Sequence, residues 1–221
     1  MIKKGGSELQ LENVKFSGKF VTIEFAPVYA MEYWGPNNNG DAFPWEEMRK
    51  NYKTFLTHGA VYLEHTYKPK TKIGFISKAD LDYTMKRIIV WADLDLTLLP
   101  EEVLNRINNK LAIGSSMGCE VPFDICSVCG HMAKNNSERC KHIPDYLLEI
   151  DNETKKLVYM INYSPIWYDL SIVASPALLL GYSLKFIKNK ESGEYESALF
   201  NFVSNPIKNY LETIKDFWQK D

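Results

Sequence analysis

The sequence predicts an α+β protein in which short strands outnumber helices, and three observations support this fold class. Several segments alternate apolar and polar residues, which is the period of a strand buried on one face. Two other segments begin with proline and acidic residues and continue with apolar residues at helical spacing. Turn-forming residues, such as the run from Asn37 to Asp41, separate these segments.

The predicted strands are spread over the middle of the chain. In residues 20–25, Val21, Ile23 and Phe25 share one face of the first predicted strand. Residues 72–78 and 87–95 flank a polar turn and form a predicted hairpin. The remaining predicted strands are residues 61–65, 113–121, 156–161 and 166–174.

Two predicted helices begin at Pro44 and Pro100. Both place glutamates in the first turn, where negative charge interacts favourably with the helix dipole. Their apolar sides are formed by Trp45, Met48, Tyr52 and Phe55 in the first helix and by Val103, Leu104, Ile107 and Leu111 in the second. The second helix leads the chain into the predicted strand at residues 113–121.

One domain is expected over residues 1–185, followed by a polar linker at 186–204 and an amphipathic helix at 205–221. The apolar side of this last helix is formed by Ile207, Tyr210, Leu211, Ile214, Phe217 and Trp218. Such a stripe either docks on its own domain or contacts a partner. A homodimer formed through this helix is therefore one expectation.

The composition excludes several classes of protein. The 221 residues are 45% hydrophobic and 24% charged, with a formal net charge of −2, so bulk charge does not favour a nucleic-acid binder. The most apolar window, residues 171–181, is broken by Pro176 and is too short to span a bilayer. The N-terminal lysines precede no apolar run, so no secretory signal is expected. We expect a soluble protein that acts on neither membranes nor nucleic acids.

A Gly-x-Ser-x-Gly sequence surrounds Ser116 in the predicted strand at residues 113–121. If this segment is a strand, Ile113 and Met117 face a core while Ser116 faces the opposite side with Gly114 and Gly118. Because the glycines have no side chains, a peptide can approach the Ser116 hydroxyl closely. The pattern is compatible with a serine nucleophile, although Gly-rich strand edges are common.

Two further residues supply the other parts that a serine nucleophile needs. His65 ends the predicted strand at residues 61–65, so we expect a strand rather than a loop to hold it. Asp169 lies within the predicted strand at residues 166–174, on the face opposite Leu170 and Ile172. A carboxylate buried there requires a partner. His65, Ser116 and Asp169 are therefore predicted to be the general base, the nucleophile and the orienting acid.

Three cysteines and a histidine predict a structural zinc site. Cys126 and Cys129 form a Cys-x-x-Cys turn, followed ten residues later by Cys140-Lys-His142, and zinc prefers four such ligands. His131 or Cys119 is the alternative for the fourth ligand. The cluster forms an inserted zinc-binding loop over residues 119–145. This region has few basic residues, which disfavours a nucleic-acid-binding zinc finger.

Cys119 is the alternative nucleophile, as a thiol. It lies on the strand face opposite Ser116, beside Met117 and Val121. That placement favours a buried structural thiol over a reactive one.

Three motifs in this order resemble those of the prohead (capsid maturation) proteases of tailed bacteriophages, which are distantly similar to the herpesvirus assemblins. The first is Leu63-Glu-His65 followed by Lys72-Ile-Gly74, and the second is Gly114-Ser-Ser116-Met-Gly118. The third is Asp169-Leu-Ser-Ile-Val-Ala-Ser-Pro176-Ala177. The resemblance covers roughly residues 20–185.

The resemblance implies a serine protease with a β-barrel core wrapped by helices. It implies that Ser116 matches the nucleophile, His65 the general base and Asp169 the acidic third member. Many relatives have glutamate at the third position and assemblins have a second histidine, so His131 or His142 is an alternative there. The zinc-binding loop departs from the simplest proteases of the family.

The resemblance also implies where the protein works and on what. Such enzymes are enclosed in the assembling procapsid in the host cytoplasm, where they cut scaffold and major capsid proteins and often themselves. A virion protein without activity that keeps the same fold, stapled by zinc, is the alternative function.

Overall fold

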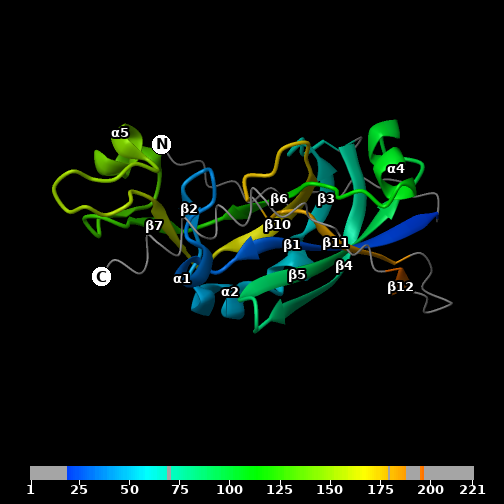
Figure 1. Cartoon of the computed structure of the whole chain (residues 1–221). Coiled ribbons are helices and arrows are strands. Elements are labelled where there is room, and N and C mark those ends of the chain that lie inside the picture. Colours follow the sequence, from blue (N-terminus) through cyan, green and yellow to red (C-terminus); the bar gives the residue numbers. More distant parts are fainter. Residues whose placement is uncertain (1–18, 69–70, 179, 188–194, 197–221) are drawn as a thin grey trace.

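The computed structural model describes residues 19–68, 71–178, 180–187 and 195–196. Within these ranges the chain is a mixed α+β protein, as the sequence predicted. An eight-stranded sheet curls into a half-barrel, and a smaller four-stranded sheet lies beside it (Figure 1). The predicted C-terminal helix at 205–221 lies outside the described residues.

The large sheet has the strand order β12-β11-β1-β5-β4-β3-β10-β6. In chain order its strands are β1 (Phe20–Tyr29), β3 (Ala60–Leu63), β4 (Lys72–Asp82), β5 (Arg87–Asp95), β6 (Ser115–Glu120), β10 (Ile166–Ile172), β11 (Ser183–Ile187) and β12 (Tyr195–Glu196). Neighbouring strands are antiparallel except for β3 and β10, which are parallel. Strand β10 lies between β3 and the edge strand β6, and it brings together three segments that are far apart in sequence.

The curl of the sheet brings its β6 edge back toward β11. Gly114 and Tyr182 form an antiparallel bridge just before these strands. On either side of the bridge, the amide of Ser115 donates to the carbonyl of Gly181 over 2.6 Å and the amide of Ser183 donates to that of Ile113 over 2.8 Å. These bonds satisfy backbone groups that an open sheet edge would leave to solvent.

The main core fills the concave side of the half-barrel. Its largest side chain, Trp167, is fully buried and stacks on Phe55 with ring centroids 5.5 Å apart. Helices α2 (Trp45–Asn51) and α3 (Thr54–His58) pack at this site, and α1 (Met31–Trp34) precedes them. The single helix predicted after Pro44 is thus two helices. Thr54 explains the break, because its hydroxyl donates to the carbonyl of Asn51 and accepts from the amide of Trp167.

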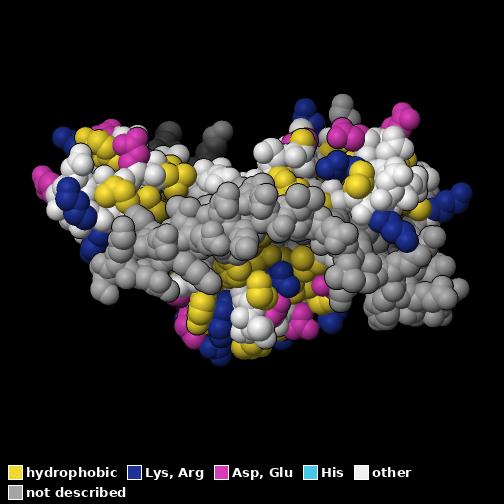
Figure 2. Space-filling view, in the orientation of Figure 1, with side chains coloured by type: hydrophobic (Ala, Val, Ile, Leu, Met, Phe, Trp, Pro, Cys, Tyr) yellow, Lys and Arg dark blue, Asp and Glu magenta, His cyan; other side chains and the backbone are white. Residues whose placement is uncertain are grey.

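The second sheet has the order β2-β9-β7-β8 and its own small core. Its strands are β2 (Asp41–Ala42), β7 (Phe123–Cys126), β8 (Met132–Ala133) and β9 (Met160–Tyr163), and it carries the helix α5 (His142–Tyr146) and a 3-10 helix (Asn136–Glu138). We call this region, residues 123–163 together with β2, the small lobe. It lies at the opposite end of the molecule from α4 (Glu101–Asn108) (Figure 1). Hydrophobic side chains are exposed on it beside acidic and basic ones (Figure 2).

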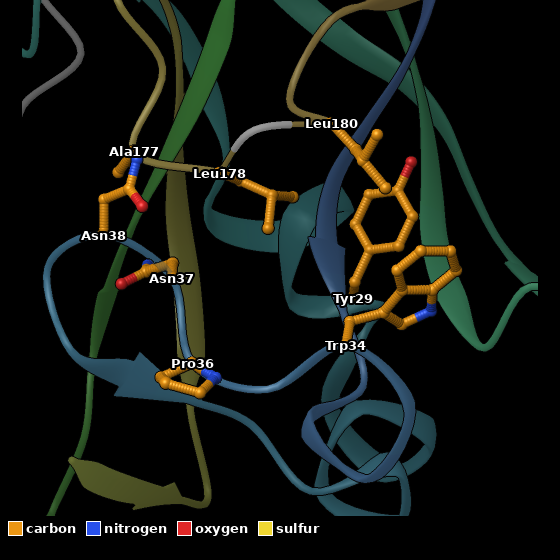
Figure 3. A pocket seen from close by; sticks show the side chains of 8 residues that line it. All are labelled: Tyr29, Trp34, Pro36, Asn37, Asn38, Ala177, Leu178 and Leu180. Atoms are coloured by element: carbon orange, nitrogen blue, oxygen red, sulfur yellow. The ribbon is translucent and has the colours of Figure 1, made fainter. Parts of the chain in front are cut away.

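One predicted boundary differs from the structure near the C-terminal end. The predicted linker at 186–204 starts within β11, and Phe186 and Ile187 pair with Glu196 and Tyr195 of β12. Before β11, the chain crosses toward the N-terminal part of the protein. There the amide of Asn38 donates to the carbonyl of Ala177 over 2.9 Å. Leu178 and Leu180 point toward Tyr29 and Trp34 around a cavity of about 20 Å³ (Figure 3).

None of the helices in the described ranges has the length and the apolar character needed to span a bilayer.

Candidate active site and metal site

A β-bulge in β10 determines which way Asp169 points. Trp167 pairs with Cys119 of β6, but Asp169 pairs with Gly118, so Tyr168 is an extra residue. In a regular strand Trp167 and Asp169 would face the same side, whereas here Trp167 enters the core and Asp169 faces the opposite side of the sheet. From Asp169 to Ile172 the alternation is as expected, because Leu170 and Ile172 pack in the main core while Asp169 and Ser171 face the other side.

His65 lies in a turn, which corrects the prediction that a strand holds it. Strand β3 ends at Leu63, and both Glu64 and His65 have left-handed backbone conformations, with φ values of 49° and 52°. Non-glycine residues rarely adopt this conformation, and such strain concentrates at functional sites. The turn ends the alternation of the strand and carries His65 over the sheet face on which Asp169 lies.

The structure brings His65 and Asp169 into direct contact. Nδ1 of His65 lies 2.6 Å from Oδ2 of Asp169, and this carboxylate is fully buried while 37% of the histidine side chain is exposed. The hydrogen bond that His65 donates to Asp169 raises the pKa of His65 above its ordinary value, and partial burial opposes this rise. The pairing therefore gives Asp169 the partner that its burial requires, and it fixes Nδ1 of the ring as the donor.

Ser171 links the two residues and was not predicted as a site residue. Its buried hydroxyl donates to Oδ1 of Asp169 over 2.8 Å and accepts from the backbone amide of His65 over 3.1 Å. One hydroxyl thus holds both the carboxylate and the turn that carries the imidazole. Because Ser171 follows Asp169 by two residues in a strand, the sequence already placed both on one face.

Ser116 lies on the same face of the sheet as Asp169. In the antiparallel pairing of β6 and β10, Ser116 is directly opposite Ser171 and Gly118 is directly opposite Asp169. Opposite residues project to the same side, with Cβ atoms about 4.5–5.5 Å apart. Met117 and Cys119 pack against the main core on the other side, as predicted.

The described residues include no hydrogen bond between the Ser116 hydroxyl and His65. Catalytic hydrogen bonds are often long or poorly aligned before a substrate binds. The structure therefore shows a direct contact between His65 and Asp169. For Ser116 it shows only that the residue lies on the same sheet face, through the pairing of β6 with β10.

Both glycines of the Gly-x-Ser-x-Gly sequence lie close to atoms of other chain segments, and Gly118 lies against the site residues Asp169 and Tyr67. A Cβ atom on Gly118 would lie 3.1 Å from Cβ of Asp169 and 3.0 Å from the Tyr67 hydroxyl. A Cβ atom on Gly114 would lie 2.4 Å from the backbone oxygen of Val173. Gly114 therefore has no room for a side chain, and Gly118 has room for one only if its neighbours shift by a few tenths of an ångström, independently of any substrate.

Tyr67 covers the buried carboxylate from the solvent side. Its hydroxyl lies 3.4 Å from Nδ1 of His65 and 3.5 Å from Oδ2 of Asp169. Its ring makes edge contacts with Tyr62 and Tyr168, at centroid distances of 5.5 Å and 5.7 Å. Burial and the nearby Asp169 charge raise the pKa of Tyr67, so it stays a neutral donor. No sequence pattern marked this residue.

Cys119 has the environment of a buried thiol. It packs against the main core, and burial, with a smaller effect of Asp41, raises its pKa to about 12. A thiol with such a pKa is almost wholly protonated at neutral pH, and the thiolate is the nucleophilic form. This environment does not suit the alternative of Cys119 as a nucleophile.

The four predicted metal ligands come together in the small lobe. Ligand atoms of Cys126, Cys129, Cys140 and His142 all lie within 4.8 Å of one another. Sγ of Cys129 is 3.5 Å from Sγ of Cys140, and Nδ1 of His142 is 3.6 Å from Cys140 and 3.8 Å from Cys126. A tetrahedral site with metal–sulfur bonds of about 2.3 Å has edges of about 3.8 Å. The cluster therefore fits a four-coordinate metal ion.

The alternative fourth ligands point elsewhere. Nε2 of His131 donates to the carbonyl of Glu138 over 2.8 Å, and Cys119 belongs to the main core. The turn at Cys126 is closed by backbone bonds from Gly130 to Cys126 and from Cys126 to His131, each 3.0 Å long. Gly130 has a left-handed φ of 70°, which allows this tight turn.

No family model matches the chain, and no curated protein or solved structure gave a match. The residues of the two sites therefore carry the functional argument alone.

Proposed function

We propose that this protein is a serine endopeptidase in which His65 is the general base, Ser116 the nucleophile and Asp169 the residue that orients the base. The supporting observation is the contact between the buried Asp169 carboxylate and Nδ1 of His65. With Nδ1 engaged, Nε2 is the ring atom available to exchange a proton with a hydroxyl. The register of β6 and β10 supports Ser116 as that hydroxyl.

The proposed reaction is acyl transfer. Nε2 of His65 takes the proton of Ser116 as its oxygen attacks the peptide carbonyl, and the imidazolium then protonates the departing amine. Asp169 holds the ring and stabilises its charged form. A water molecule, deprotonated by the same nitrogen, hydrolyses the acyl-enzyme and restores Ser116.

We further propose that the enzyme is a prohead maturation protease that cuts scaffold and major capsid proteins, and itself, inside the assembling procapsid in the host cytoplasm. The order of the three motifs around His65, Ser116 and Asp169 supports this assignment. A sheet curled into a half-barrel is consistent with the assemblin-like β-barrel that the resemblance implies.

We also propose that the cluster of Cys126, Cys129, Cys140 and His142 binds zinc in a structural role. Three sulfur ligands and one imidazole favour zinc over magnesium or calcium, which prefer oxygen. All four positions are filled by protein ligands, as in structural rather than catalytic zinc sites.

Labelling with a fluorophosphonate, which reacts with activated serine hydroxyls, tests the proposed activity. Mass spectrometry is expected to locate the label on Ser116. Ser116→Ala and His65→Gln are expected to abolish labelling and to leave capsid precursors uncleaved in a co-expression assay. Cys119→Ser is the matched control and is expected to keep both activities. Labelling that persists in Ser116→Ala would refute the assignment of the nucleophile.

The alternative function is a virion protein of the same fold without activity, stapled by its metal site. One observation favours it: Ser116 and His65 are not hydrogen-bonded within the described residues. It predicts no labelling of the unmodified protein and normal capsid processing in Ser116→Ala.

A further inference from the structure

The small lobe holds a carboxylate that lies beside a candidate metal ligand and is not itself one of the four clustered residues. Oδ1 of Asp151 is 3.8 Å from Nε2 of His142, which is an ion-pair distance and longer than a direct hydrogen bond. Only 12% of the Asp151 side chain and 30% of the His142 side chain are exposed. The proposed reaction and the proposed metal site use no atom of this carboxylate.

The two nitrogens of the His142 ring face different groups. Nδ1 lies 3.6 Å from Sγ of Cys140 and 3.8 Å from Sγ of Cys126, so it faces the other candidate ligands. Nε2 is the nitrogen beside Asp151. A neutral imidazole that binds a metal through Nδ1 carries its proton on Nε2, and a carboxylate attracts this N–H group. The arrangement therefore matches the sequence of metal, histidine and carboxylate that is common around zinc.

The Asp151 carboxylate is held in place by its own turn. Its Oδ2 atom accepts from the backbone amide of Thr154 over 2.7 Å and from the Thr154 hydroxyl over 2.6 Å. The amide of Asp151 donates to the carbonyl of Lys156 over 2.8 Å, and the amide of Lys155 donates to the carbonyl of Asp151 over 2.9 Å. Because Oδ2 is committed to Thr154, Oδ1 is the oxygen that faces His142.

The core of the small lobe keeps this turn next to the metal cluster. Ile150 and Leu157 form an antiparallel bridge at the base of the turn, and the next residue, Val158, is fully buried. Val158 belongs to the same hydrophobic core as Cys126, which is a candidate ligand. The position of the Asp151 carboxylate therefore depends on packed side chains as well as on the hydrogen bonds of an exposed turn.

We propose that Asp151 orients the ring of His142 for metal binding and increases the affinity of the site for zinc, without binding the metal itself. This role rests on the structural zinc site proposed above. A negative charge beside Nε2 favours the tautomer that leaves Nδ1 free for the metal, and it makes Nδ1 a better electron donor. Removing such a carboxylate typically lowers metal affinity by about 10- to 100-fold, which is the change expected for Asp151.

The zinc affinity of Asp151→Asn, measured in the full chain by competition with a coloured chelator, tests this role. Asparagine keeps an oxygen that accepts from Thr154, but it removes the charge beside His142. The dissociation constant for zinc is expected to rise about 10- to 100-fold. Asp151→Ser also keeps an acceptor for the turn, and it carries the test if Asp151→Asn does not fold.

Glu153→Gln is the matched control, because it removes the same charge from an exposed position of the same turn. It is expected to leave the zinc affinity unchanged. Cobalt bound in place of zinc reports the ligand set through its visible absorption, which is expected to be the same in Asp151→Asn and the unmodified protein and to change in His142→Ala. A defect confined to the turn would lower the melting temperature of the metal-free protein, so that temperature is measured in each variant.

The outcomes separate the role of Asp151 from the metal site itself. If the unmodified protein binds zinc and Asp151→Asn binds it equally well, Asp151 is only a turn residue and the metal site stands. An equal loss of affinity in Glu153→Gln would show a general effect of charge and would also overturn the role of Asp151. A changed cobalt spectrum in Asp151→Asn would make Asp151 a ligand instead. If the unmodified protein binds no zinc, the proposed metal site falls, and this role falls with it.

Discussion

Asp169 is held from two sides, so its position depends on Ser171 as well as on His65. The hydroxyl of Ser171 binds Oδ1 of Asp169, while His65 binds Oδ2. The same hydroxyl accepts a hydrogen bond from the backbone amide of His65, which lies in a left-handed turn. In the proposed mechanism, Ser171 is thus a positioning residue that aligns Asp169 with His65.

Replacing Ser171 with alanine is expected to lower kcat/KM by about 10- to 100-fold. A hydrogen bond to a charged group contributes about 1.5–3 kcal/mol, which corresponds to such a factor in rate. Ser171→Thr keeps the hydroxyl and is expected to retain most of the kcat/KM of the unmodified protein. A merely structural defect would change thermal stability without moving the pH profile, so both are measured in each variant.

The pH profile reports the contact between His65 and Asp169. Because the pKa of His65 is raised and the base acts in its neutral form, kcat/KM is expected to rise as the pH passes upward through this raised pKa. Asp169→Asn removes the negative partner, so the acidic limb is expected to move to lower pH while the maximum falls by roughly 10³- to 10⁴-fold. If the acidic limb of the pH profile lies at the same pH in Asp169→Asn and in the unmodified protein, His65 is not the titrating base.

The same pair links pH to stability. A histidine whose folded pKa is raised stabilises the folded state fully below its unfolded pKa, and this contribution is lost as the pH rises through the folded value. The unmodified protein is therefore expected to melt at a higher temperature than Asp169→Asn at low pH. This difference in melting temperature is expected to shrink as the pH rises from the unfolded pKa of His65 through its raised folded pKa. A difference that grows with pH would contradict the charged pairing.

At the scale of elements, the close packing of β6 on β10 depends on Gly118. A Cβ atom there would lie 3.1 Å from Cβ of Asp169 and 3.2 Å from its Oδ2. Gly118→Ala is expected to shift Asp169 and to destabilise the protein by about 1–3 kcal/mol, the usual cost of overpacking. Urea unfolding measures the stability, and Glu120→Ala, at the exposed end of β6, is the control.

Residue patterns predicted the elements better than the turns between them. The hairpin of β4 and β5 and the helix α4 follow directly from alternation and helical spacing. The left-handed turn at Glu64 and His65 and the bulge at Tyr168 have no such signal, because the pairing with β10 imposes them. The contact between His65 and Asp169 and the cluster of Cys126, Cys129, Cys140 and His142 were predictable from residue types. The contacts of Ser171 and Tyr67 depend on packing across the fold, which the sequence pattern does not show.

At the scale of the whole molecule, the two sheets bury cores of very different size. Among the described residues, the core of the small lobe has only four buried residues, Cys126, Ile143, Val158 and Met160, and one of them is a candidate metal ligand. The half-barrel has its own extensive core around Trp167. A core as small as that of the lobe does not offset the entropy of folding by itself. We therefore expect the metal to hold the small lobe and the hydrophobic core to hold the half-barrel.

Removing the metal is expected to loosen the small lobe without unfolding the half-barrel. Elemental analysis of the purified protein is expected to give one zinc per chain, and Cys129→Ser or a strong chelator is expected to release it. Hydrogen exchange would then accelerate in residues 123–163, while the β4–β5 hairpin stays protected, because no ligand lies in that hairpin.

Cys119→Ser removes a cysteine that is not a ligand and is expected to keep both the zinc and the protection. His131→Gln is the matching histidine control, since Nε2 of His131 is committed to the carbonyl of Glu138. Loss of zinc in either control would mean that the ligand set is wrong. Equal loss of protection in both sheets after chelation would mean that the metal stabilises the whole chain, because the lobe and the half-barrel would then unfold as one cooperative unit.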